Sequence, residues 1–420
     1  MIPPVEKIWN PLFWFYLAVG LVWAYRSRLA LETLKRTPVV APSESSGASE
    51  KERVTVIVPA KNEEKNIETC VRSLLAQDYP HLEIIVVNDN STDRTEAILN
   101  VLGLQIQNSE AVGTQINERN YIKNKILHSS GEYQEAGGPA FRYFNNPTAA
   151  PPGWTGKNFA IHQAIPHAAG SWLLFTDADT RHEKSSVRSA LGHAQSRDLE
   201  FLTLLPECLT GSFLEKMIQP LAMALLGLWF PMQKVNDPKS GVIFANGQFL
   251  LMTRALYRKT GGHEAVRGEF LEDFALMRKT RALGARAECA FGYRIFGTRM
   301  YDSLSAIRRG WRRIYLHAFQ RRPEILFSKT LGVLAFSLLP FALFPFLTAK
   351  ALAFPKLYGF SWGAAFVILI FILATSWRAY RFVKVNPLYA FLHPAPMFFL
   401  MLILGDAAWT AAAKKPTVWR

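Results

Sequence analysis

Long apolar runs at both ends of the chain constrain its fold more than any other feature. The first, Ile8–Tyr25, is just long enough to cross a bilayer and carries aromatic residues toward both ends, as interfacial belts do. Arg26 and Arg28 follow at once, and no small-residue cleavage site precedes them, which argues against a cleaved signal peptide. We therefore predict a membrane anchor over residues 1–28, with a helix lying in the membrane interface as the alternative.

Three further apolar segments lie in residues 330–420, at Leu331–Leu347, Leu357–Trp377 and Leu388–Ala412. Prolines interrupt the first and the last, so the first is expected to be kinked or re-entrant and the total number of spans is three or four. Clustered arginines and lysines beside the apolar runs place the middle of the chain in the cytoplasm. These features predict a multi-pass protein of the inner membrane with a cytoplasmic catalytic domain.

The charge balance supports a membrane surface rather than nucleic acid. Lys and Arg number 48 against 33 Asp and Glu, and the basic residues gather beside the apolar runs. No zinc finger, helix-turn-helix pattern or aromatic-basic repeat indicates a nucleic-acid partner. The three scattered cysteines favour buried thiols over disulfides or a zinc site. Residues 29–53 are predicted to form a solvated linker, and residues 301–329 a basic interfacial helix region.

Between these regions, residues 54–300 alternate buried strands with helices. Val54–Pro59, Glu83–Asn88 and Ser171–Thr176 are continuous apolar or β-branched runs, typical of parallel strands covered on both faces. Helical periodicity separates them, which predicts an α/β fold with a doubly wound, mostly parallel sheet. Ligands of such sheets bind beyond the carboxyl ends of the strands. Further strands are expected at Phe141–Phe144, at Glu200–Leu205 and, as strand, turn and strand, at Ile243–Met252, while residues 105–146 resemble a surface insertion.

Polar clusters follow these strands and point to a diphosphate and a metal ion. Asp177 and Asp179 flank one small residue just past a strand, where they can share Mg²⁺ or Mn²⁺ with a diphosphate. Such a pair is elsewhere most often a capping or surface pair, but its position in the sheet favours the metal site. The Gly-Lys turn at Lys157 lacks P-loop spacing, yet a turn at a helix start can still meet a diphosphate.

Two later segments could line the binding site of an acceptor substrate. Gly247 and Gln248 lie in a small-residue turn that a substrate can approach closely, although an ordinary turn explains them equally well. Glu272 and Asp273 begin an apolar-periodic helix, and acidic residues also favour helix N-termini without any catalytic role. The apolar stretch Phe213–Pro231 is expected to be an interfacial helix beside the acceptor site, or else a buried core helix.

The motifs VIVPAKNEE, VVNDNSTDRT, GWTGKN, FTDADT and LEDFALMRKTRALG, in this order, resemble family 2 glycosyltransferases of the GT-A fold. The resemblance covers Val54 to about Tyr315. Within the family the chain is most similar to hopene-associated glycosyltransferases, through PPGWTGKNFA, the VNDP segment and the flanking apolar helices. This resemblance implies a nucleotide-diphospho-sugar donor, a divalent metal and a membrane lipid acceptor.

The resemblance also implies roles for individual residues. Asp273 would be the general base of an inverting displacement, and Glu272, Gly247 and Gln248 would lie at the acceptor. Asp179 would bind the metal, with Asp177 beside it. The remaining donor-site residues would bind the nucleotide-sugar: Pro59, Ala60, Asn62, Glu63, Asp89, Lys157, Asp177, Arg309 and Arg312.

The chain departs from the family pattern in its last motif. Arg309 and Arg312 match, but Arg313 stands where the family usually has Trp. The Trp form is typical of processive enzymes, so this departure favours a single transfer over a polysaccharide synthase, which remains the alternative function. The arginines around Arg309 also fit an amphipathic belt on anionic lipid. A catalytically silent scaffold is less consistent with the sequence, because the metal and base carboxylates are all present. A nucleotidyltransferase usually has a Gly-rich loop after its first strand, and no such loop follows Val58.

Overall fold

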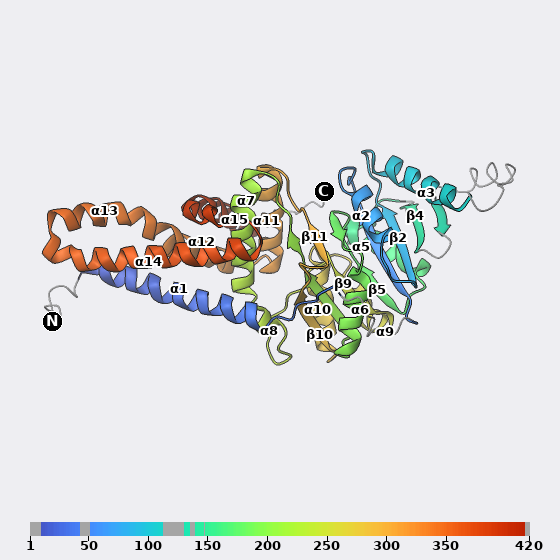
Figure 1. Ribbon diagram of the computed structural model, residues 1–420, viewed down its shortest axis with the longest axis horizontal. Helices are drawn as coiled ribbons and strands as arrows, with labels where there is room; N and C mark the ends of the chain where they lie inside the picture. Colours follow the sequence, from blue (N-terminus) through green and yellow to red (C-terminus); the bar gives the residue numbers. More distant parts are fainter. Residues whose placement is uncertain (1–9, 43–50, 112–129, 135–138, 147, 416–420) are drawn as a thin grey trace. The chain divides into compact units, whose positions relative to one another are not determined.

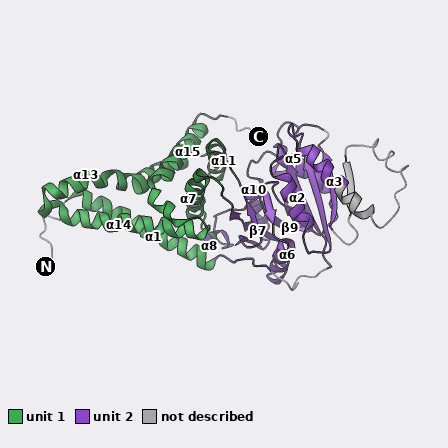
Figure 2. Cartoon of the chain, turned by 45° about the horizontal axis from the view of Figure 1, so that its top comes forward, with its two compact units in different colours: residues 1–36, 210–233, 301–417 green, residues 37–209, 234–300, 418–420 purple. Residues whose placement is uncertain are grey.

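The structure is a computed structural model that describes residues 10–42, 51–111, 130–134, 139–146 and 148–415. The chain forms two compact units, coloured in Figure 2. Unit 1 contains residues 1–36, 210–233 and 301–417, and unit 2 contains residues 37–209, 234–300 and 418–420. Parts of the predicted linker, of the 105–146 insertion and of the N-terminal run fall outside the described residues.

The described residues of unit 2 form an eight-stranded sheet with the order β10-β7-β9-β5-β1-β2-β4-β3. Figure 1 labels strands β2, β4, β5, β9 and β10 of this sheet. Its centre is parallel, because β1 pairs in parallel with both β2 and β5, and β2 pairs in parallel with β4. Strand β9 runs antiparallel to β5 and β7, and β3 runs antiparallel to β4. The expected mostly parallel α/β sheet is confirmed. The strands are β1 (Val54–Ala60), β2 (Leu82–Asn88), β3 (Ser130–Gln134), β4 (Ala140–Asn145), β5 (Trp172–Phe175), β7 (Phe201–Leu205), β9 (Leu250–Thr253) and β10 (Ala287–Phe291).

Alternate residues of β1 enter two different cores, because successive side chains of a strand point to opposite faces. Val56 and Val58 pack in the core that contains Ile67 of α2, whereas Ile57 packs in the core that contains Ala160 of α5. The sheet therefore has helices on both faces. These helices are α2 (Ile67–Leu75), α3 (Thr95–Ala111), α5 (Gly156–Ala164), α6 (Ser186–Ser196), α9 (Arg254–Thr260) and α10 (Glu272–Ala282), with short 3₁₀ turns η2 (Ile165–His167) and η3 (Glu264–Val266).

A second, three-stranded sheet completes unit 2, with the order β6-β11-β8. Its strands are β6 (Thr180–His182), β11 (Phe296–Thr298) and β8 (Glu207–Cys208). The predicted strand before Gly247 is wrong, because Ile243–Asn246 is described without regular structure. Asn246 instead binds β7 through side chains: its N–H donates to Thr203 Oγ1, and its Nδ2 donates to the carbonyl of Leu204, both at 2.8 Å. These bonds take the place of a strand ladder.

The predicted linker 29–53 is also partly wrong. Helix α1 (Pro11–Arg36) includes the first eight residues of this predicted linker, since their sequence LALETLKR consists mostly of good helix formers. Val40 is then only 2% exposed, and its N–H donates to the carbonyl of Phe291 at 2.8 Å. The chain therefore enters unit 2 as an extended segment bound beside β10, well before residue 54.

Unit 1 is helical, and its described residues contain three helical segments long and apolar enough to cross a membrane. They are Pro323–Ala353, Pro355–Phe382 and Pro394–Ala412. Helix α1 is not among them, because its described apolar part ends before Arg26, after about 15 residues or about 22 Å at 1.5 Å per residue. The helices of unit 1 are α1, α7 (Phe213–Trp229), α11 (Leu304–Ala318), α12 (Pro323–Val333), α13 (Leu339–Ala353), α14 (Pro355–Phe382) and α15 (Pro394–Ala412), with η5 (Pro387–Leu392) before α15 and α8 (Met232–Val235) crossing the boundary between the units.

The first of these segments is irregular where its proline predicted a kink. A π-helical stretch, Leu334–Leu338, joins α12 to α13 just before Pro340. Proline has no N–H, so the carbonyl of Phe336 four residues earlier loses its helical donor. The indole Nε1 of Trp23 on α1 donates to that carbonyl at 2.6 Å, and Tyr16 donates to the carbonyl of Pro340 at 2.7 Å. Helix α1 thus stabilises the irregular segment within unit 1.

Helix α7 is part of unit 1, so the predicted catalytic range 54–300 is interrupted by residues 210–233. It contacts α11, α14 and α15, and about half of its residues are buried. Its polar Gln219 is fully buried and donates to the carbonyl of Tyr301 at 3.2 Å. Helix α7 thus packs within unit 1, as the alternative of a core helix predicts, and its place in a membrane interface beside an acceptor stays a prediction.

Candidate active site

Three polar loops follow the parallel strands β2, β1 and β5 at one edge of the sheet of unit 2. They begin at Asp89, Lys61 and Thr176. The ends of β1 and β2 pair at Ala60 and Asn88, and the neighbouring strand β5 ends at Phe175, which pairs with Ile57 of β1. The loop after β5 carries Asp177 and Asp179 and turns at once into β6. Because the strand ends are adjacent, residues from separate stretches of sequence meet at this edge.

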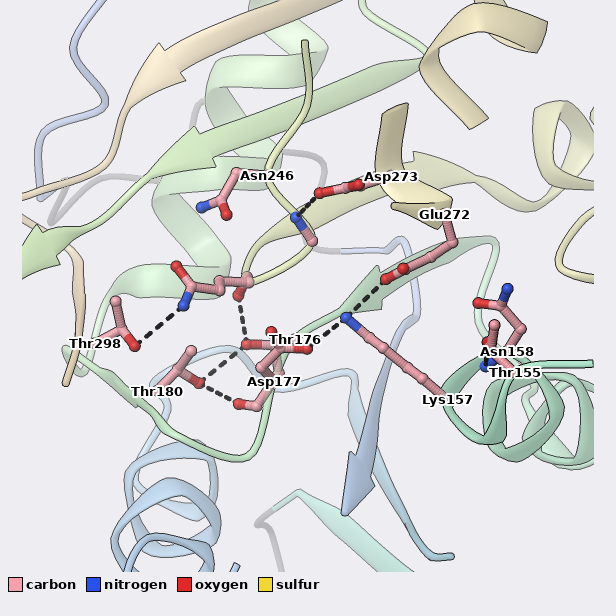
Figure 3. Close-up of polar contacts among 12 residues, drawn as sticks. Thr155, Lys157, Asn158, Thr176, Asp177, Thr180, Asn246, Glu272, Asp273 and Thr298 are labelled. Carbon is pink, nitrogen blue, oxygen red and sulfur yellow. Dashed lines mark hydrogen bonds and ion pairs between the residues drawn. The ribbon is translucent and has the colours of Figure 1, made fainter. Parts of the chain in front are cut away.

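Lys157 lies between two of the predicted site carboxylates (Figure 3). Its Nζ is 2.7 Å from Asp177 Oδ1 and 2.7 Å from Glu272 Oε1, and the lysine side chain is 9% exposed. Thr155 caps the helix α5 that carries Lys157 by accepting the N–H of Asn158. Burial lowers the pKa of Lys157, but the two carboxylates raise it further than burial lowers it, so the ammonium stays charged.

Asp273 adjoins this pair at the start of α10 and is buried. Its Oδ2 accepts the N–H of Gly247 at 2.7 Å, and its Oδ1 accepts the N–H of Phe274 at 2.8 Å. Burial and the negative charge of Glu272 raise the pKa of Asp273 to about 7, against the opposing effects of Lys157 and the two N–H donors. The carboxyl group therefore exchanges its proton near neutral pH, as a general base must.

The space around Gly247 explains why the turn before β9 has a glycine at this position. A Cβ atom at this position would lie 3.1 Å from Glu272 Oε1 and 3.3 Å from both Asp273 Oδ2 and Lys157 Nζ. The backbone of this turn consequently packs directly on the charged group. Gln248 faces elsewhere: its Nε2 donates to Thr298 Oγ1 at 3.2 Å, and its carbonyl accepts the hydroxyl of Thr176 at 2.7 Å.

A buried hydroxyl and imidazole network supports the Asp177–Asp179 loop from behind. His182 Nε2 lies 3.1 Å from Thr176 Oγ1 and 3.0 Å from Thr180 Oγ1, and Thr180 also donates to the carbonyl of Asp177 at 2.7 Å. Burial lowers the pKa of His182 to about 3, so the ring is neutral. The sequence analysis missed Thr176, Thr180 and His182, although both threonines directly flank the acidic pair.

Asp89 belongs to a neighbouring cluster at the ends of β1 and β2. Its Oδ1 accepts from Asn146 Nδ2 at 2.9 Å, its Oδ2 lies 3.3 Å from Lys61 Nζ, and its N–H donates to the carbonyl of Ala60 at 2.8 Å. Asn62 and Glu63 tie the same loops together, since Asn62 Oδ1 accepts the N–H of Thr92 and Glu63 N–H donates to Thr95. Pro59 precedes them in β1.

The structure thus joins Lys157, Asp177, Glu272, Asp273 and Gly247 by direct contacts. Asp179 shares the loop of Asp177, and its carbonyl accepts the hydroxyl of Thr298 at 3.3 Å. Arg309 and Arg312 lie on α11 in unit 1, where Arg312 Nη1 is 3.5 Å from Asp406 Oδ2. Their part in nucleotide binding stays a prediction.

The metal expectation rests on two carboxylates. Among the described residues, no group of three or more His, Cys, Asp or Glu side chains is arranged to hold a metal ion. Asp177 and Asp179 nevertheless supply hard oxygen donors on one turn, and Mg²⁺ is commonly held by one or two carboxylates together with substrate phosphates. The residues present fit such a metal.

Two stretches of the chain match sequence profiles of glycosyltransferases. Residues 55–109 match Glycosyl transferase family 2, and residues 146–314 match Glycosyltransferase like family 2. A 4,4'-diaponeurosporenoate glycosyltransferase of Staphylococcus aureus (strain MRSA252) is 24% identical over 261 residues. The alignment covers 61% of this chain and 59% of that relative.

A solved structure has the same fold. It is the mannosyltransferase PcManGT from Pyrobaculum calidifontis in complex with GDP-Man and Mn²⁺, with 18% identity and a TM-score of 0.50, and the similarity covers 96% of this chain and 100% of that one. The matched stretch 146–314 contains Lys157, Asp177 and Asp273, and the stretch 55–109 contains Asp89. The chain therefore contains glycosyltransferase family 2 domains, matched over residues 55–109 and 146–314.

Proposed function

We propose that the protein transfers one sugar, with inversion, from a nucleotide-diphospho-sugar to a hydroxyl or acid group of a membrane lipid. The observation that carries this proposal is the single lysine that joins Asp177 to the Glu272–Asp273 pair. One side of Lys157 offers groups suited to a diphosphate and a metal, and the other side offers a base. Transfer requires both within reach of one sugar.

In this mechanism Asp273 accepts the proton of the acceptor hydroxyl while the hydroxyl oxygen attacks the anomeric carbon. The bond between that carbon and the diphosphate breaks, and the nucleoside diphosphate leaves with the bonding electrons. Lys157 offsets the charge that develops on the leaving group. Asp177 and Asp179 would hold Mg²⁺ or Mn²⁺, which when bound stabilises the diphosphate as a Lewis acid.

The donor is proposed to be a UDP-sugar, with its nucleoside near Ala60, Asn62 and Asp89. These residues cluster at the ends of β1 and β2, one strand away from Asp177. Arg309 and Arg312 are proposed to contribute to diphosphate binding, since guanidinium groups pair well with phosphates. The mannosyltransferase of the same fold was solved with GDP-Man, so GDP-sugars belong among the donors tested.

The acceptor is proposed to be a polyisoprenoid lipid such as a hopanoid, delivered from a bilayer that the apolar helices of unit 1 span. Three helical segments of the described residues are long and apolar enough for this, and the staphylococcal relative is named a 4,4'-diaponeurosporenoate glycosyltransferase. The positive-inside rule further suggests that unit 2 faces the cytoplasm. The proposed location is therefore the inner membrane.

Purified full-length protein tests the proposal. In detergent with Mn²⁺, radiolabelled UDP-glucose, UDP-GlcNAc, GDP-mannose and a dTDP-sugar are each offered with a hopanoid polyol or an isoprenoid carboxylic acid. Label is expected in the organic phase, with loss of transfer on chelation by EDTA and recovery with Mn²⁺ or Mg²⁺. Failure of every donor to release nucleoside diphosphate would contradict the enzymatic assignment.

The pH dependence of transfer should follow Asp273. Only the ionised carboxylate accepts a proton, so the rate is expected to rise as pH increases through about 7 and then to level off. Two charged side chains act on Asp273, the negative Glu272 and the positive Lys157. Glu272→Gln removes the negative charge, which makes ionisation easier and should move the inflection to lower pH. A profile that keeps its inflection in this variant would count against Asp273 as the titrating base.

A further inference from the structure

Asn158 follows Lys157 on the first turn of α5, and its side chain makes an unusual set of bonds. The residue has 0% exposure, and its Nδ2 donates to the carbonyls of Val266 at 2.9 Å, Arg267 at 3.1 Å and Glu269 at 3.0 Å. An amide nitrogen carries two hydrogens, so the three carbonyl acceptors share them and at least one hydrogen is bifurcated between two carbonyls. All three of these carbonyl acceptors lie within one short backbone segment, residues 266–269.

That segment is the connection that leads into α10. It runs from Val266, the last residue of the 3₁₀ turn η3, to Leu271, and Glu272 and Asp273 follow it immediately. Because residues 267–271 form neither helix nor strand, their backbone carbonyls depend on partners from elsewhere. Asn158 supplies those partners for three of the six residues.

A second set of contacts joins the same two segments. The N–H of Thr155 donates to the carbonyl of Arg267 at 2.8 Å. A Cβ atom on Gly268 would lie only 3.2 Å from the carbonyl oxygen of Gly153, so the two backbones approach closely. The turn 153–158 and the segment 266–271 are therefore held together along several residues, and Asn158 is the buried centre of the contact.

The adjacent residues Lys157 and Asn158 of this turn bind different parts of the connection into α10. Asn158 binds its backbone, while Lys157 binds Glu272 at its end and Asp177 across the site (Figure 3). Resting on the function proposed above, we infer that Asn158 is a positioning residue, which sets the distance of Asp273 from the donor held at Asp177 and Asp179. A shift of about 1 Å in such a group can reduce a rate by about 100-fold.

The side-chain chemistry is specific to asparagine. A serine hydroxyl has one hydrogen and a shorter reach, alanine has none, and aspartate would place a negative charge against three carbonyl oxygens. Each of these changes releases the segment without removing Lys157, Glu272 or Asp273 themselves. The proposed role is thus separable from the charges of the site.

The test compares Asn158→Ala and Asn158→Ser with the wild-type full-length protein in detergent. Turnover of lipid glycosylation is expected to fall about 10- to 100-fold, while UDP binding measured by calorimetry stays within about threefold, because the donor-side residues are unchanged. The inflection of the pH profile should also shift, since the position of Asp273 relative to the charges of Glu272 and Lys157 changes. If Asn158→Ala does not accumulate, Asn158→Ser decides the question.

Asn236→Ala is the matched control. Asn236 also binds backbone within unit 2, accepting the N–H of Cys289 and donating to its carbonyl, both at 2.8 Å. It should lower the thermal midpoint without changing the pH profile. Equal effects of the Asn158 and Asn236 variants on turnover, midpoint and profile would reduce Asn158 to a structural residue. Normal turnover in the Asn158 variants with an inactive Asp273→Asn would overturn the positioning role alone, whereas an active Asp273→Asn would remove the proposed base and this role with it.

Discussion

Asp273→Asn is expected to reduce sugar transfer by about 100- to 10,000-fold while UDP binding remains measurable. Asparagine keeps the shape of the side chain, but its single oxygen can accept only one of the two N–H groups that bind Asp273, and it cannot take the acceptor proton. The change also removes a buried negative charge beside Glu272, which offsets the lost acceptor, so the thermal midpoint should change little. Turnover, UDP calorimetry and thermal unfolding measured on one preparation check all three results.

Glu288→Gln provides the control for this substitution. Glu288 is a buried carboxylate of β10, 2.7 Å from His193 Nε2 and 2.8 Å from Arg197 Nη2, and it belongs to unit 2 but not to the site. Its neutralisation should lower stability while turnover of the folded enzyme stays near that of the wild type. If Asp273→Asn retained full transfer, another group would have to accept the proton.

Lys157→Met is expected to produce the largest loss of stability in unit 2. It leaves Asp177 and Glu272 without the ammonium that now lies 2.7 Å from each. Breaking a buried ion pair by removing one partner typically costs about 3–5 kcal/mol. Glu272 should account for most of this, because its side chain is 8% exposed whereas that of Asp177 is 31% exposed and partly hydrated. Thermal unfolding in detergent, monitored by tryptophan fluorescence, measures the effect, and donor binding should weaken as well.

The double variant Lys157→Met/Glu272→Gln tests the cause of that loss. If an uncompensated charge at Glu272 destabilises the single variant, neutralising Glu272 should restore a large part of the midpoint. A purely steric effect of methionine would not be relieved by this second change. A single variant that melts like the wild type would show that the lysine bridge contributes little to folding.

Local sequence predicted the central strands because burial on both faces requires uninterrupted apolar residues. Val54–Pro59 and Glu83–Asn88 meet that requirement and form β1 and β2. The same rule failed at Ile243–Asn246, where the hydroxyl of Thr203 in β7 binds both the N–H and the carbonyl of Asn246 in place of a strand ladder. Sequence periodicity does not reveal where side-chain hydrogen bonds take the place of a strand ladder.

The organisation of the chain into units also depended on contacts between distant segments. Phe213–Trp229 is apolar and lies within the catalytic half of the sequence, yet it packs with α11, α14 and α15 in unit 1. Its amphipathic pattern is compatible with any apolar surface, so the pattern alone left two interpretations open. Likewise, charge and length at the N-terminus did not reveal that Tyr16 and Trp23 bind the carbonyls of an irregular helix.

The sequence by itself determined the α/β sheet, the apolar helices and the candidate carboxylates, since the apolar pattern of a strand, the length of an apolar helix and residue chemistry are local properties. Only the tertiary structure decided that Lys157 bridges Asp177 and Glu272, and that Asn158 binds the segment before Asp273. These partners are far apart along the chain, and the folding of the parallel strands brings them to one edge of the sheet. The proton affinity of Asp273 depends on that arrangement, because burial and neighbouring charges exist only in the folded protein.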